Sequence, residues 1–456
     1  MSKIDAYLSP PNTLARPQPG RCRAYAPPGE RKAEIVSPPG AVEDIAAFRL
    51  RARHWLAQHM PKLPDGSDNQ SLLQDDEYGV RARELQRLLH EGGFAGLCFP
   101  VEYGGQGLTR AHQQAFTEES VPYEMPVLFN VPTLSILAPT LLDFGTEEQK
   151  KRHLPAIIRG DEIWVQMLSE PSGGSDLAGL VTSGRRDGDA FVVNGSKIWT
   201  SGAFRADYAM CLVRTDWHAP KHRGLTMFIV KIHQPHIEVR RIKRVNGNMD
   251  FCQEFFDDLL IPVEDVLGEE NKGWAVASRL LYHEREAAGG GSHYVSGVAS
   301  GNAEEGGQQT DLIELATATG QGGDPRVRQL VAEAVVNDRV QQHLIERVTT
   351  GIKNEHFPLP TGAFLRLFAA INGERRHDIG LELAGVSGGA WCDDDPGGEW
   401  GEKFLYRQGG SLAGGSNEMQ RNLISERVLA MPREYAADLD KPFDEVRHNQ
   451  PVEGRS

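Results

Sequence analysis

Residues 169–201 read SEPSGGSDLAGLVTSGRRDGDAFVVNGSKIWTS, and this stretch decides the fold that we expect. It opens with glycines and serines, which let a backbone approach a ligand closely and supply short hydrogen-bond donors. Two β-rich runs, 191–193 and 198–201, flank Asn194-Gly195, which is a strong two-residue turn signal. We therefore predict a β-hairpin that turns at Asn194-Gly195, with a Gly/Ser loop at one end and Trp199 beside two hydroxyls at the other. Such a unit suits a flat, hydrogen-bonding cofactor.

The same stretch resembles the flavin-binding middle region of the acyl-CoA dehydrogenases. The resemblance rests on the order and spacing of six motifs: Ser169-Glu170-Pro171, Gly174-Ser175-Asp176, Asp187-Gly188-Asp189, Asn194-Gly195, Lys197 and Trp199-Thr200-Ser201. Each motif alone is weak, but together they are specific, and the alternative is a β-hairpin that binds nothing. The phrases GFAGLCFPVEYGGQGL and GTEEQKKRHLPAI are similar to the N-terminal domain of the same family. The resemblance covers residues 42–434 and implies FAD as the cofactor.

Composition narrows the class of protein. At 456 residues the chain exceeds one ordinary core, so two or three domains are expected. Lys and Arg total 49 against 63 Asp and Glu, a net charge of −14, and an acidic surface argues against nucleic acid as a partner. The five cysteines are scattered without a CxxC pair, which favours reduced thiols over disulfides or zinc. No apolar run approaches the ~20 residues of a spanning helix, so we expect a cytoplasmic protein with no membrane partner.

The chain divides by its patterns into consecutive parts. Segment 1–41 holds eight prolines and is predicted to be a disordered arm, and the charged end, 435–456, a mobile tail. We predict an α+β multidomain fold: an N-terminal helical domain at 42–162, a middle antiparallel β-barrel domain at 163–268 and a C-terminal helical bundle at 269–434. This is the layout that the family resemblance implies. Expected helices include 42–60, 78–91, 110–123, 134–142, 147–158, 311–319, 327–350, 365–384 and 418–429, and expected strands include 208–213, 226–230, 238–242 and 252–256.

One carboxylate stands out on a helix that opens at Gly273. Glu284 follows Trp274, Ala277 and Leu281 at helical spacing, so it shares their apolar stripe and is either half-buried or faces a pocket. Burial raises a carboxyl pKa, which suits a general base working near neutral pH. The alternative is that Glu284 only pairs with Arg285 or another helix neighbour, and the stripe alone leaves both interpretations open.

The family resemblance implies a role for Glu284. Acyl-CoA dehydrogenases abstract the α-proton of an acyl-CoA with one glutamate, found either near the C-terminus or on this helix just before an arginine. Here Gly414 occupies the C-terminal place, and Glu284-Arg285 occupies the helical one. The resemblance therefore implies that Glu284 is the base, that a hydride leaves the β-carbon for flavin N5, and that Arg285 lies at the substrate.

Further residues are assigned by the same resemblance. It implies that Leu168, Ser169, Trp199, Thr200 and Ser201 bind the flavin. In the C-terminal phrase SLAGGSNEMQRN, it places Ser416, Asn417 and Glu418 at the AMP-side half of FAD; it also places Ser175 at the flavin or the acyl-CoA. Trp199 has the alternative interpretation of an ordinary core aromatic.

One departure concerns the oligomer. The family carries an arginine segment that reaches the flavin of a neighbouring subunit, whereas this chain reads ELATATGQGGDPRVRQ with Ala318 at that position, and Arg328-Gln329 is the only remnant. The resemblance implies a homo- or hetero-oligomer, dimeric or tetrameric, with an electron-transfer flavoprotein as acceptor. The departure favours an alternative in which the chain is the partner subunit of a heteromeric acyl-CoA dehydrogenase. An oxidase or monooxygenase on the same fold is a further alternative.

Three other patterns bear on function. Gly289–Gly291 beside the presumed base predicts room for a bulky or ring-bearing acyl group. The basic loop 220–224 is either a coenzyme contact or a solvated turn. Ser387 lies in a GxSxG string, but no strand is predicted before it, so we reject a hydrolase nucleophile there.

Overall fold

The computed structural model describes residues 42–64, 69, 78–288, 292–294, 307–390 and 397–446. The predicted arm, 1–41, and the glycine run, 289–291, lie outside these residues, so neither prediction is tested. The described helices and strands all belong to one compact unit, 43–456. Among the described residues, no helix combines the length and apolarity needed to cross a membrane.

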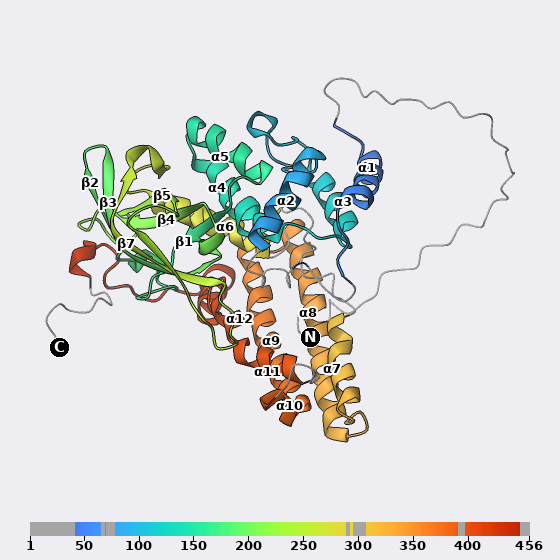
Figure 1. Cartoon of the computed structure of the whole chain (residues 1–456). Helices are drawn as coiled ribbons and strands as arrows, with labels where there is room; N and C mark the ends of the chain where they lie inside the picture. Colours follow the sequence, from blue (N-terminus) through green and yellow to red (C-terminus); the bar gives the residue numbers. More distant parts are fainter. Residues whose placement is uncertain are drawn as a thin grey trace, which may run out of the picture. The chain divides into compact units, whose positions relative to one another are not determined.

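The described residues begin with a helical region (Figure 1), made of α1 (Ile45–His59), α2 (Tyr78–Glu91), α3 (Arg110–Ser120), a π-helical segment (Phe129–Leu137), α4 (Ala138–Phe144) and α5 (Glu147–Arg159). Asp44 caps α1 by accepting hydrogen bonds from the amides of Ala46 and Ala47, and Thr146 caps α5 in a capping box with Gln149.

The apolar residues Ile45, Phe48, Leu50, Trp55 and Leu56 predict a buried stripe along α1, and the observed face differs from it at Leu50. The buried face is Phe48, Ala52 and Leu56, which follow at i, i+4 and i+8. Leu50 was expected on this face, but it is 64% exposed. The reason is geometric, because two residues of helix turn a side chain about 200° away from Phe48.

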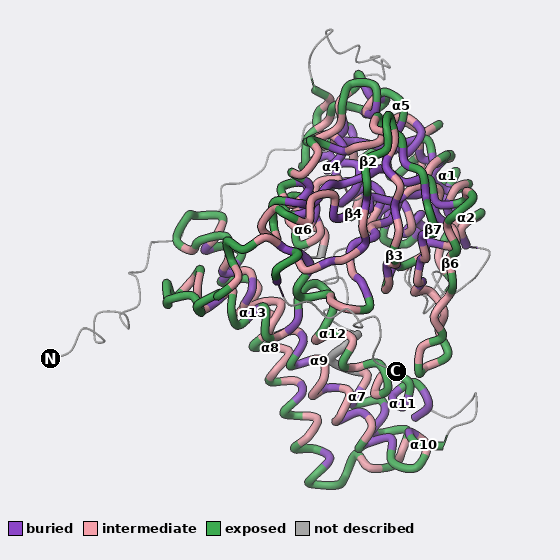
Figure 2. The backbone as a smooth tube through the Cα atoms, turned by 90° about the vertical axis from the view of Figure 1, so that its left-hand side faces the viewer, coloured by how far each residue is buried: buried purple, intermediate pink, exposed green. Residues whose placement is uncertain are grey.

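An eight-stranded sheet comes next (Figure 1), in the order β6-β7-β3-β2-β4-β5-β8, with β1 paired to β4. The strands are β1 (Trp164–Met167), β2 (Ser183–Asp187), β3 (Ala190–Ser201), β4 (Tyr208–Arg214), β5 (Leu225–Lys231), β6 (Ile237–Arg241), β7 (Phe251–Pro262) and β8 (Val266–Leu267). Most neighbours are antiparallel, whereas β1 and β2 each pair in parallel with β4. Strands β4 and β5 are buried almost end to end, and Figure 2 shows how the buried backbone gathers in the sheet and the N-terminal helices.

The predicted hairpin turn at Asn194-Gly195 is wrong. Strand β3 runs through both residues, and the hairpin turns instead at Gly188-Asp189, where Asp187 of β2 pairs with Ala190 of β3. Asn194 and Gly195 mark a register shift against β7, where Asn194 and Asp258 exchange two hydrogen bonds of 3.0 and 2.9 Å. Gly195 has φ +142° and touches Thr182 so closely that a Cβ would lie 2.6 Å from its Oγ1. The Asn-Gly pair therefore serves an irregular strand rather than a turn.

The chain becomes helical again after the sheet, with α6 (Gly273–Ala288), α7 (Gly307–Ala318), α8 (Pro325–Lys353), α9 (Ala363–Ala384), α10 (Val386–Gly389), α11 (Gly398–Tyr406), α12 (Gly409–Leu412), α13 (Asn417–Leu423) and a π-helical segment (Ile424–Val428). Helices α8 and α9 pack side by side (Figure 1). Leu312, Ile379, Leu383 and Trp400 form a separate small core. Short 3-10 turns lie at Val101–Tyr103, Leu177–Gly179, Ala203–Arg205, Val263–Asp265, Leu359–Gly362 and Phe443–Glu445.

The predicted fold class is confirmed: a helical region, a sheet and a second helical region succeed one another along the chain. The boundaries assigned to the domains remain predictions.

Residues 442–446 dock on the loop after β4, a contact that the expected mobile tail does not include, whereas Tyr435 is 91% exposed. Phe443 is buried, and its amide donates to the carbonyl of Ala219, while the amide of Asp444 donates to that of Trp217. The Phe443 ring lies 3.5 Å from the guanidinium of Arg214, a fully buried cation. An aromatic ring in a charged segment thus anchors the chain end against the loop after β4.

Candidate active site

The Gly/Ser loop after β1 is tied to β3 by one buried lysine. Lys197 donates to the carbonyl of Leu168 over 3.1 Å and to a carboxylate oxygen of Glu170 over 2.8 Å. The amide of Ile198 donates to the carbonyl of Ser169 over 2.9 Å. Leu168 and Ser169, both predicted flavin contacts, are therefore fixed beside the strand that carries Trp199.

Glu170 completes this clamp. Its carboxylate also accepts hydrogen bonds from the amides of Val181 and Thr182 over 2.7 and 3.0 Å. Burial opposes ionisation, but the charge and hydrogen bond of Lys197, together with those amides, outweigh it and hold the pKa of Glu170 below its ordinary value. The pair is therefore an ion pair at neutral pH, buried in the strand-loop junction.

Trp199 is presented to the outside by a β-bulge. Ile198 pairs with Gln253 and Thr200 with Cys252, so Trp199 is the extra residue of β3 at this point. Its φ of +68° is uncommon for a bulky residue. The side chain is 54% exposed, with its ring 5.8 Å from that of Phe251, so the core interpretation of Trp199 is wrong. The bulge leaves the indole and the neighbouring exposed Ser201 open to a ligand.

Thr200 points the other way. It is buried, and its hydroxyl donates to Glu254 of β7 over 2.8 Å. Glu254 is fully buried, and burial raises its pKa to about 8 despite the hydrogen bond from Thr200. The Thr200 side chain is therefore engaged in the interior, and a cofactor contact from this residue would have to come from its backbone.

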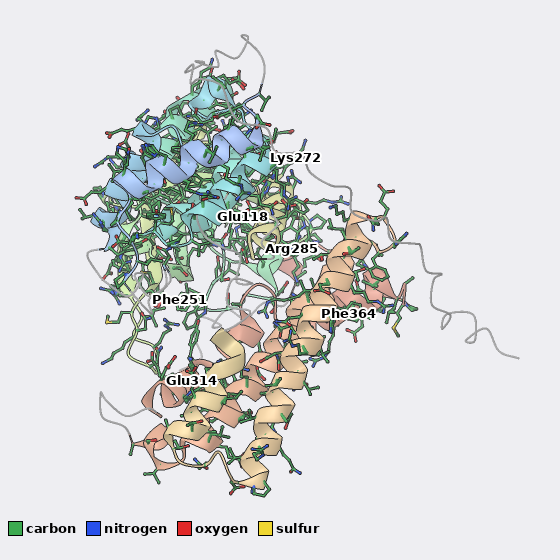
Figure 3. The ribbon with its side chains drawn as sticks, turned by 90° about the vertical axis from the view of Figure 1, so that its right-hand side faces the viewer. Glu118, Phe251, Lys272, Arg285, Glu314 and Phe364 are labelled. Atoms are coloured by element: carbon green, nitrogen blue, oxygen red, sulfur yellow. The ribbon has the colours of Figure 1, made fainter. Side chains whose placement is uncertain are left out.

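Glu284 lies half-buried on α6 and is hydrogen-bonded to β1. The side-chain amide of Gln166 donates to its Oε2 over 2.9 Å. This partner comes from another element, and the alternative pairing of Glu284 with Arg285 is not observed; Arg285 itself is exposed near the end of α6 (Figure 3). Because Gln166 lies two residues before Leu168, the hydrogen bond joins the proposed base to the strand that leads into the Gly/Ser loop.

Helix α6 is fixed to α4 by a charged cluster. The Asp143 carboxylate accepts from Arg279 over 2.6 Å and is 3.0 Å from Nε2 of the buried His283. Burial opposes ionisation of Asp143, but the hydrogen bonds from Arg279 and His283 keep its pKa below its ordinary value. This contact sets the position of the residue that follows His283, which is Glu284.

The remaining predicted residues are dispersed. Ser175 is exposed in the Gly/Ser loop, and Gln329 is exposed on α8. Ser416 caps α13, Asn417 donates to Ser411 over 2.9 Å, and Glu418 pairs with Arg421. Within the described chain, the hydrogen bonds of Ser416–Glu418 stay inside the C-terminal helices. The structure thus joins Leu168, Ser169, Trp199 and Glu284 through β1 and β3, and leaves the C-terminal element separate from that network.

Sequence reasoning missed Gln166, Glu254 and the roles of Glu170 and Lys197. A signal existed for Gln166, because it is a single polar residue inside the apolar run IWVQML. The rejected GxSxG string comes after helix α9, not after a strand, and Ser387 donates to the carbonyl of Ala384.

Comparisons with known proteins agree on one family. The models of the acyl-CoA dehydrogenase N-terminal and middle domains match residues 43–161 and 166–259. Acyl-CoA dehydrogenase IpdE1 of Mycobacterium tuberculosis is 33% identical over 400 residues, which cover 86% of this chain and 99% of that protein.

Two solved structures are similar over nearly their full length. The Tcur3481-Tcur3483 steroid ACAD has a TM-score of 0.68 at 27% identity, covering 86% of this chain and 98% of that one. The ChsE4-ChsE5 complex from Mycobacterium tuberculosis has a TM-score of 0.65 at 26% identity, covering 88% and 100%.

Proposed function

Because this chain belongs to the acyl-CoA dehydrogenase family, we propose that it oxidises an acyl-CoA thioester between Cα and Cβ with FAD as cofactor and Glu284 as base. Family membership makes the protein an oxidoreductase acting on acyl-CoA. The observation that carries the finer proposal is the hydrogen bond between Glu284 and Gln166, because it ties a half-buried carboxylate to the strand that leads into Leu168 and Ser169.

The residues present fit a flavin. Trp199 offers an exposed aromatic face on a bulged strand, Ser201 an exposed hydroxyl, and Ser169 a half-buried hydroxyl beside Gly174. In the C-terminal element, Oδ1 of Asn417 is buried and has no hydrogen-bond partner within the described chain, so a ligand donor would satisfy it. Bound FAD would supply one chemical capacity, acceptance of the hydride that leaves Cβ.

The residues of this chain supply the other half of the reaction, which is removal of the α-proton. Deprotonation at Cα needs a base close to the thioester and aligned with the Cα–H bond. In this proposal a Glu284 carboxylate oxygen takes the α-proton as the Cα–Cβ double bond forms and the β-hydrogen departs with its electron pair. Two electrons then leave for an electron-transfer flavoprotein, which is our proposed acceptor.

The proposed acyl group is bulky and ring-bearing. Support comes from the name of one similar structure, a steroid ACAD. A panel of straight-chain, branched and sterol-derived thioesters tests it, and strict preference for short straight chains would exclude it.

The test of the chemistry is anaerobic bleaching of the purified protein's flavin absorbance by an acyl-CoA. Glu284→Gln should slow bleaching by about 10²–10⁴-fold, the usual contribution of a general base, without loss of acyl-CoA binding. Glu286→Gln is the matched control, since Glu286 lies two residues along the same helix and accepts from Tyr282 instead. Full-rate bleaching by Glu284→Gln would remove the base assignment, and rapid reoxidation by oxygen would favour an oxidase.

A second candidate is that the chain works as one subunit of a heteromeric dehydrogenase. Both similar structures carry paired names, Tcur3481-Tcur3483 and ChsE4-ChsE5. Ala318, at the position where the family carries an arginine, is exposed at the end of α7. Expression of this chain alone, with its mass and flavin content per chain, separates the two cases: one flavin per chain in a homo-oligomer excludes the pair.

A further inference from the structure

Gln166 is half-buried in β1, and its side-chain amide makes a single hydrogen bond within the described chain. Nε2 donates to Oε2 of Glu284 over 2.9 Å, while Oε1 is buried and has no partner there. A buried polar atom without a partner is uncommon and costs stability. Such an atom calls for an explanation other than the stability of the fold.

The orientation of this amide is forced. With the amide flipped, Oε1 would face the Glu284 carboxylate, and two acceptors would meet without a proton between them. Only the observed orientation gives the carboxylate a donor, so Gln166 binds one chosen oxygen of Glu284.

Both partners are held by rigid elements. Gln166 pairs with Met210 in the β1–β4 ladder, and the hydroxyl of Thr133 accepts from the amide of Trp164 in the same strand. On the other side, α6 is bound to α4 through Arg279 and His283, which flank Asp143. The donor and the carboxylate therefore meet between two fixed backbones.

We propose that Gln166 is a positioning residue for the base: it holds Oε2 of Glu284 and thereby turns Oε1 toward the α-carbon. The inference rests on the proposed function and deepens it. A neutral amide suits this task, because it fixes the carboxylate by a hydrogen bond without the full positive charge of an arginine or lysine, which would favour the ionised form more strongly.

The decisive variant is Gln166→Met, which keeps the length and volume of the side chain and removes the donor. With the acyl-CoA that bleaches the wild type fastest, kcat should fall roughly 10–100-fold, the effect of a misplaced catalytic group, while KM stays within about twofold because acyl-CoA binding is shared by many contacts. The thermal unfolding midpoint should hold or rise, since the orphaned Oε1 is removed as well.

Gln86→Met is the matched control. Gln86 is a buried amide that donates to the carbonyl of Ile158 over 2.8 Å, so its loss costs one hydrogen bond without a contact to Glu284. This variant should lower the unfolding midpoint and leave kcat unchanged. If Gln86→Met and Gln166→Met each lower kcat and the unfolding midpoint in parallel, Gln166 is merely structural and the inference is overturned.

Gln166→Glu tests the contact with Glu284 itself. A second carboxylate against Glu284 would share a proton with it, because two like charges at this distance do not both ionise readily. The acid limb of the kcat/KM profile should therefore move to higher pH. A profile that coincides with that of the wild type would contradict the contact.

The two levels of the proposal fail in different ways. If Glu284→Gln bleaches at full rate, the proposed base is wrong. If Glu284→Gln is slow but Gln166→Met is as fast as the wild type, the base stands and the positioning role of Gln166 is excluded.

Discussion

Lys197 and Glu170 form the buried ion pair that holds the Gly/Ser loop, and removal of either partner should lower the free energy of unfolding. Lys197→Met leaves the Glu170 carboxylate in the interior without its cation, so the free energy of unfolding should fall by about 3–5 kcal/mol. Urea denaturation measures the loss. Lys272→Met is the control, because its pair with Glu269 is on the surface and should cost less than about 1 kcal/mol. Equal losses would contradict the buried clamp.

Glu254 predicts a pH dependence of stability with a defined sign. Its pKa is about 8 in the folded chain and 4.5 in the ordinary state, so the folded form keeps a proton that the unfolded form releases. This contribution is fully present below pH 4.5 and is lost as the pH rises through about 8.

Glu254→Gln should remove that decline, which urea melts at intervals from pH 5 to pH 9 would reveal. Glu264→Gln, at an exposed carboxylate just after β7, should leave the slope as it is in the wild type. If the unfolding free energy of Glu254→Gln declines with pH as steeply as that of the wild type, a group other than Glu254 is responsible for the decline.

Single residues were only partly predictable. Helical spacing puts Glu284 on an apolar stripe, with which its half-buried position agrees, but only the family resemblance singled it out as a base. Gln166 and Glu254 could not be predicted, since their importance arises from partners 118 and 54 residues away along the chain. The inward turn of Thr200 depends on the bulge at Trp199, which no local pattern announces.

At the scale of elements, a substitution at Gly195 tests whether the close approach to Thr182 explains the irregularity of β3. Gly195→Ala would put a Cβ 2.6 Å from Oγ1 and 2.8 Å from Cα of Thr182, at a φ of +142°. We expect a loss of about 2–4 kcal/mol, combining overpacking and backbone strain, in urea denaturation. Gly188→Ala meets nothing within 4 Å at φ +62°, so its loss should stay near 1 kcal/mol. A larger loss at Gly188 would mean that the close approach to Thr182 is not the constraint.

The existence and type of elements could be predicted well from periodicity, and the exceptions are instructive. Helix α2 has the predicted limits, Tyr78–Glu91, because an apolar face of period 3.6 fixes it locally. The hairpin was misplaced because Asn-Gly is compatible with both a tight turn and an irregular strand, and only pairing with β2 and β7 decides between them. A pattern read from one sequence shows the local turn signal but not the pairing with distant strands that can override it.

For the whole molecule, a substitution at Phe443 tests whether docking of the chain end contributes to stability. It is buried against the guanidinium of Arg214, whose pKa burial lowers to about 10. Phe443→Ala should cost about 3 kcal/mol of unfolding free energy, at the lower limit for a buried aromatic. Tyr435→Ala is the control in the same segment, because Tyr435 is 91% exposed and should change stability by less than about 0.5 kcal/mol. Similar effects of both would contradict a specific anchor.

The order of helical region, sheet and helical region could be predicted from the sequence, whereas the docked end could not. Five charged residues between 435 and 446 indicate a solvated segment, and the ring of Phe443 gives no sign of its binding place. That place is a loop more than 200 positions earlier, near Trp217 and Ala219.

This distance has a consequence for the order of events during synthesis. Arg214 leaves the ribosome long before Phe443 is made, so the guanidinium lacks this aromatic neighbour while the C-terminal helices are still being translated. Nascent chains that stop short of Phe443 therefore lack the ring that packs on Arg214, and they differ from finished chains in the surface that a chaperone or a protease meets at this loop.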